Sequence, residues 1–253
     1  MTDRANLVAA ARDTIARGSQ SFAAASTLFA PATRERAWLL YAWCRAADDM
    51  TDGQDLGHGG GELADADAVQ HRLEALTEAA FDGDGDVPLA FAALRQVAAE
   101  TEMPRAFIAD HLAGFALDAA EWRPQDEADL LRYCYHVAGS VGCMMAVVMG
   151  VAADDEDTLD RACDLGLAFQ LANIARDIVP DAQVGRCYLP ATWLAEYGIA
   201  EADLAGPARR EEVAALAARL VSMARPYRRS ARVGVARLPF RSRLAVLAAD
   251  GIY

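Results

Sequence analysis

Apolar residues recur along this chain at intervals of three and four, the spacing that places them on one face of an α-helix. Glycine and proline fall mostly between these periodic stretches. The pattern predicts an all-α protein. The expected helices cover residues 5–16, 19–28, 33–52, 65–81, 88–100, 104–121, 127–151, 155–179, 207–224 and 239–249.

Length and composition favour a single domain over residues 1–253. A chain of 253 residues can bury about three quarters of its unfolded surface in one core. The uncharged, apolar stretch over residues 137–153 is shorter than the roughly 20 residues that a membrane-spanning helix needs, and four acidic residues follow it. We therefore expect this stretch to be a helix buried in the core of a helical bundle.

Two pairs of aspartates stand out against these apolar helices. Asp48 and Asp52 form one pair, and Asp177 and Asp181 form the other. Because a helix turns about 100° per residue, each pair shares one helix face. Like charges at this spacing destabilise a helix by roughly 0.2–0.5 kcal/mol per pair. Two such faces suggest that a cation lies between them.

Other polar residues extend the two stripes. Tyr41 and Arg45 precede the first pair on its face, and Gln170 and Asn173 precede the second. Mg²⁺ binds through one or two carboxylates together with substrate phosphates, which makes it the favoured cation. The alternative is a pair of solvated helix faces, since the chain has 37 acidic residues. The apolar segments 38–44 and 165–169 favour the buried site, because buried charge must be paired or metal-bound.

The charge and the cysteine content of the chain argue against several classes of protein. The net charge of −13 argues against a nucleic-acid partner and against general adhesion to anionic membranes. The five cysteines have no zinc-site spacing, and no signal sequence precedes the first helix. We therefore expect a cytoplasmic protein whose cysteines pack in the core.

Three segments resemble the squalene/phytoene synthase family. They are residues 41–52 (YAWCRAADDMTD), 132–142 (RYCYHVAGSVG) and 166–190 (GLAFQLANIARDIVPDAQVGRCYLP). The resemblance is greatest to the bacterial phytoene synthase branch and extends from about Ser21 to the last residue. It implies an isoprenoid-synthase-type helical bundle with a central cavity. Relative to the family, we expect the chain to lack at least one C-terminal helix, including a basic residue that helps to bind diphosphate.

The family implies a head-to-head condensation of two geranylgeranyl diphosphates to phytoene, via prephytoene diphosphate, in carotenoid biosynthesis. The implied cofactor is Mg²⁺, with Mn²⁺ as the alternative, and no NADPH is expected. One alternative is a squalene-type synthase that makes squalene, dehydrosqualene or hydroxysqualene from farnesyl diphosphate. Another is a noncatalytic helical assembly factor. Because the product is a hydrocarbon, we also expect peripheral contact with the inner membrane, and other carotenoid enzymes are candidate partners.

The same resemblance implies residue roles. The implied metal ligands are Asp48, Asp52, Asn173, Asp177 and Asp181. The implied catalytic residues are these four aspartates and Tyr41. The implied substrate-binding residues are Ser21, Phe22, Arg45, Tyr133, Val137, Val141, Gln170, Asn173, Arg176 and Tyr188.

Some of these positions have a simpler interpretation. Arg176 can form a salt bridge with a neighbouring aspartate, Tyr188 can pack on a lid, and Val137 and Val141 can be core residues. Two positions also depart from the family pattern, namely Thr51 between the first aspartates and Pro180 between the second. Because proline removes a backbone donor, the helix is expected to kink or end near Pro180.

Overall fold

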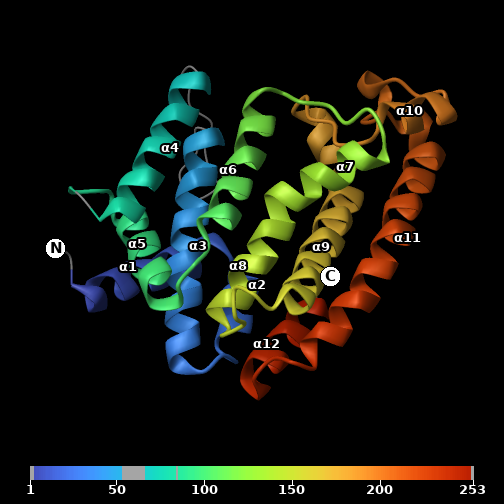
Figure 1. The fold of residues 1–253 in the computed structure, drawn as a ribbon. Helices are drawn as coiled ribbons and strands as arrows, with labels where there is room; N and C mark the ends of the chain where they lie inside the picture. The colour runs from blue at the N-terminus through green and yellow to red at the C-terminus, as the bar shows by residue number, and fades with distance from the viewer. Residues whose placement is uncertain (1–2, 53–65, 84, 252–253) are drawn as a thin grey trace.

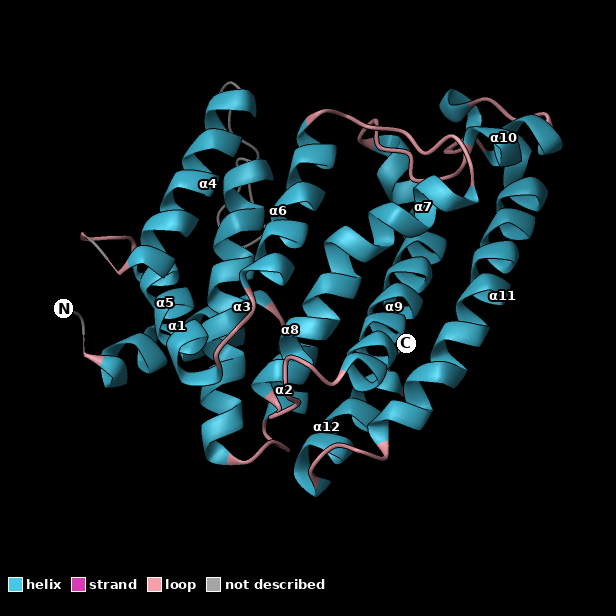
Figure 2. Ribbon diagram, in the orientation of Figure 1, coloured by secondary structure: helices cyan, strands magenta, loops and turns pink. Residues whose placement is uncertain are grey.

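The computed structural model describes residues 3–52, 66–83 and 85–251, and throughout these ranges the regular structure is helical, with no strand (Figures 1 and 2). The all-α prediction is confirmed. The α-helices are α1 (Arg4–Gly18), α2 (Gln20–Ser26), α3 (Pro31–Asp52), α4 (Ala66–Asp82), α5 (Leu89–Thr101), α6 (Arg105–Ala119), α7 (Glu127–Cys134), α8 (Ser140–Val148), α9 (Glu156–Gln183), α10 (Ala191–Tyr197), α11 (Arg210–Val235) and α12 (Phe240–Asp250). A π-helix (Tyr135–Gly139) joins α7 to α8, and two short 3₁₀ helices (Glu201–Asp203 and Pro207–Arg209) precede α11.

The helices bury two hydrophobic clusters. The first is built mainly by α1, α3, α4, α5, α6 and α8, with Trp43 and Phe91 among its fully buried side chains. The second is built mainly by α7, α9, α10 and α11, with Leu171 and Trp193 fully buried. Helices α9 and α11 pack side by side (Figure 1). Asp48 of α3 and both Asp177 and Asp181 of α9 line one cavity, so the fold brings the two aspartate-bearing helices together.

The uncharged stretch forms the π-helix, α8 and the turn after it, and most of α8 is buried. Cys143, Met144 and Val148 lie in the first cluster, which confirms the expected core position. In the described part of the chain, no helix combines the length and apolar character needed to cross a membrane.

The predicted helix over 127–151 is interrupted by the π-helix at Tyr135–Gly139. A π turn changes the backbone hydrogen-bond pattern and leaves carbonyl groups that need other partners. The His136 carbonyl accepts a hydrogen bond from the Ser140 hydroxyl at 2.7 Å and lies 3.2 Å from Nδ1 of His111. A regular helical period cannot reveal such an insertion, which is why the sequence pattern predicted one continuous helix.

The predicted ends of α9 and α11, at residues 179 and 224, are too early, because each helix continues past a proline. Helix α9 continues past Pro180 to Gln183, and α11 continues past Pro226 to Val235. Each proline removes one backbone hydrogen bond. The packing of α9 against α11 outweighs that loss, and Pro180 lies in the exposed last turns of its helix. Helix α10 was not predicted.

Glycines allow α9 to approach the π-helix and α8 closely. A Cβ atom on Gly166 would lie 2.2 Å from the carbonyl oxygen of Ala138, and one on Gly142 would lie 2.3 Å from that of Ala162. Both contacts involve backbone, which cannot rotate away. Gly166→Ala is therefore expected to lower the free energy of unfolding by about 1–3 kcal/mol.

Urea denaturation followed by circular dichroism measures this change. Gly251→Ala is the matched control, because a Cβ there would have its nearest neighbour at 3.5 Å. The close-packing interpretation is wrong if Gly166→Ala is as stable as the unchanged protein.

An ion-pair network joins α1, α3 and α5. Glu100 accepts hydrogen bonds from Arg4 at 2.6 Å and from Arg36 at 2.9 Å. Arg4 is the largest cause of a lowered Glu100 pKa, which falls to about 2 from 4.5. The ionised carboxylate therefore stabilises the fold above pH 4.5, and that contribution is lost as the pH falls towards 2. Between pH 4.5 and 2, the melting temperature of Glu100→Gln should therefore fall less steeply than that of the unchanged protein. Glu211→Gln changes an exposed position and should behave like the unchanged protein.

Candidate functional site

A polar cavity of about 860 Å³ lies between α3, α6, the α7–α8 segment and α9. Arginine and aspartate side chains from α3 and α9 line it, so segments more than a hundred residues apart meet there. The lining residues are Tyr41, Cys44, Arg45, Asp48, His111, Phe115, Asp118, Tyr133, Val137, Val141, Gln170, Asn173, Ile174, Arg176, Asp177, Asp181, Arg186 and Tyr188.

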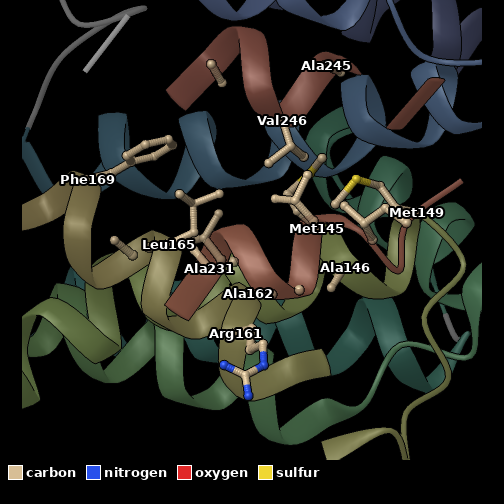
Figure 3. A pocket seen from close by; sticks show the side chains of 18 of the residues that line it. Met145, Ala146, Met149, Arg161, Ala162, Leu165, Phe169, Ala231, Ala245 and Val246 are labelled. Atoms are coloured by element: carbon tan, nitrogen blue, oxygen red, sulfur yellow. The ribbon is translucent and has the colours of Figure 1, made fainter. Parts of the chain in front are cut away.

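A second cavity, of about 360 Å³, is almost entirely apolar. It is lined by α2, the π-helix, α8, α9, α11 and α12, and Met145 of α8 and Val246 of α12 point towards each other across it (Figure 3). Four residues line both cavities, namely Val137, Val141, Gln170 and Asn173. The two spaces therefore adjoin, and together they have the shape and polarity to hold a molecule with an anionic head and a hydrocarbon tail.

On α3, Arg45 lies between two carboxylates. Its Nη1 is 2.8 Å from Oδ2 of Asp48, and its Nε donates to Oδ1 of Asp49 at 2.9 Å. The Asp48 side chain is 44% exposed and lines the cavity. The Asp49 side chain is 14% exposed and binds the guanidinium of Arg45 without lining the cavity. Asp52 is the last residue of α3, and its side chain lies outside the described residues.

On α9, the second aspartate pair faces the same cavity. Arg176 donates from Nε to Oδ1 of Asp177 at 2.8 Å, so the salt bridge expected as the simpler role of Arg176 is present. The Asp181 carboxyl is half-buried, and desolvation, followed by the negative charge of Asp177, raises its pKa. Arg186 and Arg176 oppose this rise. A carboxyl whose pKa is raised by burial and by a neighbouring negative charge, as that of Asp181 is, marks a place where an added cation is favourable.

Asn173 has an unsatisfied acceptor in this cavity. Its Nδ2 donates weakly to Oε1 of Gln170 at 3.4 Å, but its Oδ1 is buried and has no hydrogen-bond partner among the described residues. Leaving a buried acceptor unsatisfied costs about 1–3 kcal/mol. A bound cation, or a donor group on a ligand, would satisfy this oxygen.

The donor set therefore fits a hard divalent cation, whose ligands are carboxylate and amide oxygens. Within residues 3–52, 66–83 and 85–251, no three acidic, histidine or cysteine side chains are close enough to share one ion. Mg²⁺ usually completes its coordination with water and substrate phosphate, so a partial set of protein ligands suits it.

A cluster of two tyrosines and one aspartate forms another wall. The Tyr133 hydroxyl lies 3.0 and 3.2 Å from the two Asp118 oxygens, and the Tyr188 hydroxyl donates to Asp118 at 3.1 Å. The two rings stack with their centroids 4.8 Å apart. Burial is the main cause of a raised pKa in both tyrosines. Both hydroxyls therefore stay protonated and donate to Asp118.

Sequence reasoning did not identify Asp118. The available signal was on α6, where His111, Phe115 and Asp118 recur at intervals of four and three and so share the face towards the cavity. The acidic residue at helical spacing from Asp118 is Glu121, three residues on, so the Asp-x-x-x-Asp pattern that drew attention to the other aspartates was absent.

Of the remaining predicted residues, all but Ser21 line one or both cavities. Phe22 lines the apolar cavity, and its ring meets that of Tyr41 edge-on at 5.6 Å. Val137 and Val141 lie where the cavities adjoin, so they contribute to packing and lining together. Ser21 is exposed and lines neither cavity.

Comparison with known proteins agrees with this geometry. The profile of the squalene/phytoene synthase family matches residues 15–253. The 15-cis-phytoene synthase of Enterobacter agglomerans is 52% identical over 238 residues, which are 93% of this chain and 80% of that protein. The 15-cis-phytoene synthase of a Paracoccus species is 49% identical over 250 residues, which are 98% of this chain and 80% of that protein.

Among solved structures, a dehydrosqualene synthase in complex with a ligand superposes with a TM-score of 0.83 at 27% identity. The match covers 97% of this chain and 84% of that one. The fold, the matched profile and these relatives agree, and the chain belongs to the squalene/phytoene synthase family.

Proposed function

We propose that this protein condenses two molecules of geranylgeranyl diphosphate to phytoene, via prephytoene diphosphate, in carotenoid biosynthesis. The observation that carries the proposal is the junction of the two cavities, one lined by arginines with Asp48, Asp177 and Asp181 and the other apolar. The relatives named 15-cis-phytoene synthase, at 52% and 49% identity, support the choice of substrate.

In this reaction the first substrate loses diphosphate, and the double bond of the second attacks the resulting allylic cation. Loss of the second diphosphate, rearrangement of the cyclopropane ring and loss of one proton then give phytoene. Arg45 and Arg176 line the polar cavity and can bind diphosphate oxygens through planar guanidinium groups that remain charged. Excluding water from the apolar cavity protects the carbocations from hydrolysis.

The aromatic side chains are suited to the cationic intermediates. Tyr41, Tyr133 and Tyr188 line the polar cavity. An aromatic face can stabilise a desolvated cation by about 2 kcal/mol. Because both Tyr133 and Tyr188 donate to Asp118, their rings are held in one orientation.

Mg²⁺, with Mn²⁺ as the alternative, is the proposed cofactor. Its candidate ligands are Asp48, Asp52, Asn173, Asp177 and Asp181. When bound, the ion would neutralise charge on the departing diphosphate. Removing divalent ions with EDTA should abolish turnover, and adding Mg²⁺ should restore it; full activity in EDTA would refute the metal assignment. The reaction to phytoene ends in proton loss, so no NADPH is expected.

The direct test is an extraction assay with purified protein, Mg²⁺ and labelled geranylgeranyl diphosphate, without NADPH. Farnesyl diphosphate is tested in parallel, because the dehydrosqualene synthase likeness keeps a squalene-type activity as the second candidate. Phytoene from the longer substrate supports the proposal. Product from farnesyl diphosphate alone would indicate the squalene-type reaction. Failure to convert either would leave the noncatalytic assembly factor as the better interpretation.

The proposed location of the protein follows from the chemistry of its product. A hydrocarbon product is expected to leave towards a lipid phase, so the proposal includes a cytoplasmic protein in peripheral contact with the inner membrane. The next carotenoid enzymes are candidate partners for the same reason.

A further inference from the structure

Helix α6 places a histidine in the wall of the polar cavity. Among the described residues that line this cavity, His111 alone carries an imidazole. The residue is 6% exposed, and its ring meets those of Trp43 and Phe115 edge-on, with centroids 5.6 and 4.8 Å away. Neither the proposed metal ligands nor the arginines proposed to bind diphosphate include it. A buried titratable group in the wall of such a cavity is a candidate for catalysis.

The π-helix fixes the ring of His111 through one of its two nitrogens. Helix α6 packs against the π-helix and α8 (Figure 1). Nδ1 of His111 lies 3.2 Å from the His136 carbonyl, which also accepts from the Ser140 hydroxyl. Because a carbonyl accepts only from a donor, Nδ1 carries the hydrogen of the neutral ring and Nε2 carries the lone pair. His136 precedes Val137, which lines both cavities, so the imidazole is held beside their junction.

Nε2 of His111 is available to accept a proton. Among the described residues, the ring makes its hydrogen bond through Nδ1, and none reaches Nε2. Desolvation lowers the pKa of His111 from 6.5 to about 4, and the His136 carbonyl opposes this shift. The ring is therefore neutral at physiological pH, with its lone pair free.

The carboxylates that line the same cavity are less suitable bases. Asp118 accepts from two tyrosine hydroxyls, and Asp48 and Asp177 are paired with arginines. Hydrogen bonds and positive charge favour the ionised form of a carboxylate and so weaken it as a base. Asp181 is a proposed metal ligand. The neutral imidazole of His111 is the proton acceptor that these partners leave unused.

We propose that His111 is the base that removes the last proton in the condensation to phytoene. This inference rests on the proposed function, because it takes the bound molecules to be prenyl diphosphates. The proton leaves one of the carbons that the reaction joins, and these are the carbons that carried diphosphate. In a bound substrate such a carbon lies where the anionic head meets the hydrocarbon tail. That position corresponds to the junction of the two cavities beside His111.

Proton transfer to Nε2 removes the charge from the hydrocarbon. The electron pair of the broken C–H bond forms the new carbon–carbon double bond and neutralises the allylic cation, while the proton binds to Nε2. An imidazolium is unfavourable at a buried position. It therefore passes its proton to an oxygen of the released diphosphate, which restores the neutral ring before the next turnover.

The distribution of products from labelled geranylgeranyl diphosphate tests this role. His111→Asn keeps an amide donor near the position of Nδ1 and removes Nε2. The variant should consume substrate at a rate within about threefold of the unchanged protein, whereas phytoene should fall by about a hundredfold, the loss expected for a missing general base. Water should capture the cation that is not deprotonated, so alcohols with the same carbon skeleton should replace phytoene.

Two further variants complete the experiment. His136→Asn is the matched control, because His136 also joins the π-helix to α6, with Nδ1 2.9 Å from the Asp110 carbonyl, but lines neither cavity. It should make phytoene as the unchanged protein does. His111→Gln also lacks the imidazole and should show the same change of products as His111→Asn. Circular dichroism checks that each variant is folded.

A purely structural role for His111 predicts a different result. Substrate consumption and phytoene would then fall in proportion, and phytoene would remain the main product of both His111 variants, which would overturn the proposal. The unchanged protein separates this failure from that of the proposed function. If it makes phytoene and the variants keep its product distribution, only the role of His111 is refuted. If it makes no phytoene, the proposed function fails, and the role of His111 fails with it.

Discussion

Asp177→Asn is expected to lower the rate of phytoene formation by about 10²–10³-fold, the loss seen when one preorganised electrostatic group is removed from an active site. The substitution keeps the size of the side chain and removes its charge. Asp177 lines the polar cavity, supports Arg176 and contributes to the raised pKa of Asp181. Without that charge, the proposed divalent cation should bind less well, and the diphosphate should leave less readily. The initial rate of labelled product formation measures the change.

The control for this variant lies on the same helix. Asp160 is an exposed aspartate of α9 outside both cavities, so Asp160→Asn should keep full activity. Thermal unfolding should be nearly the same in both variants, because partly exposed ion pairs contribute only about 0–1 kcal/mol. A rate within a factor of three of the unchanged protein for Asp177→Asn would contradict the assignment.

Asp118→Asn is expected to lower turnover by about 10²-fold, the cost of a small misplacement of groups around the reacting centre. A carboxylate accepts from both tyrosine hydroxyls, whereas an amide offers one oxygen and presents N–H donors to the other hydroxyl. The stacked rings of Tyr133 and Tyr188 would then lose their common anchor. Steady-state kinetics should show the loss mainly in kcat, since the arginines proposed to bind diphosphate are unchanged.

A matched variant and a double-mutant cycle test this interpretation. Asp110, also on α6, accepts a hydrogen bond from the Tyr135 hydroxyl but does not line the cavities, so Asp110→Asn should affect turnover far less. If Asp118 acts through the tyrosines, Asp118→Asn combined with Tyr133→Phe should cost less than the sum of the two single effects. Strict additivity would indicate that Asp118 acts independently.

The sequence predicts the parts of the site that depend on local spacing. The aspartate pairs and Asn173 are visible because a helical period is a property of a few consecutive residues. The meeting of α3 and α9 depends instead on which apolar faces pack together, so the spacing suggested it only through a shared cation, and the resemblance to a known family supported it. Asp118 was missed for the same reason, since its partners Tyr133 and Tyr188 are distant in sequence.

The predicted helix boundaries also show that local sequence patterns do not reveal contacts between distant segments. Pro180 and Pro226 are correct local signals for the loss of a backbone hydrogen bond, yet both lie inside helices. Contacts between α9 and α11 outweigh that local cost, and they are invisible in either segment alone. The π turn at Tyr135–Gly139 was hidden because a single inserted residue leaves the apolar composition unchanged.

The unsatisfied oxygen of Asn173 has a consequence for the abundance of the protein in the cell. A ligand that satisfies this oxygen binds the folded chain and not the unfolded one, so occupancy raises the free energy of unfolding. Proteolysis in cells draws on the small unfolded fraction, which a change of 1–2 kcal/mol alters several-fold. The protein is therefore expected to persist while its substrate is supplied and to be degraded faster when that supply stops. Its steady-state level would then follow the flow of prenyl diphosphates without any dedicated regulator.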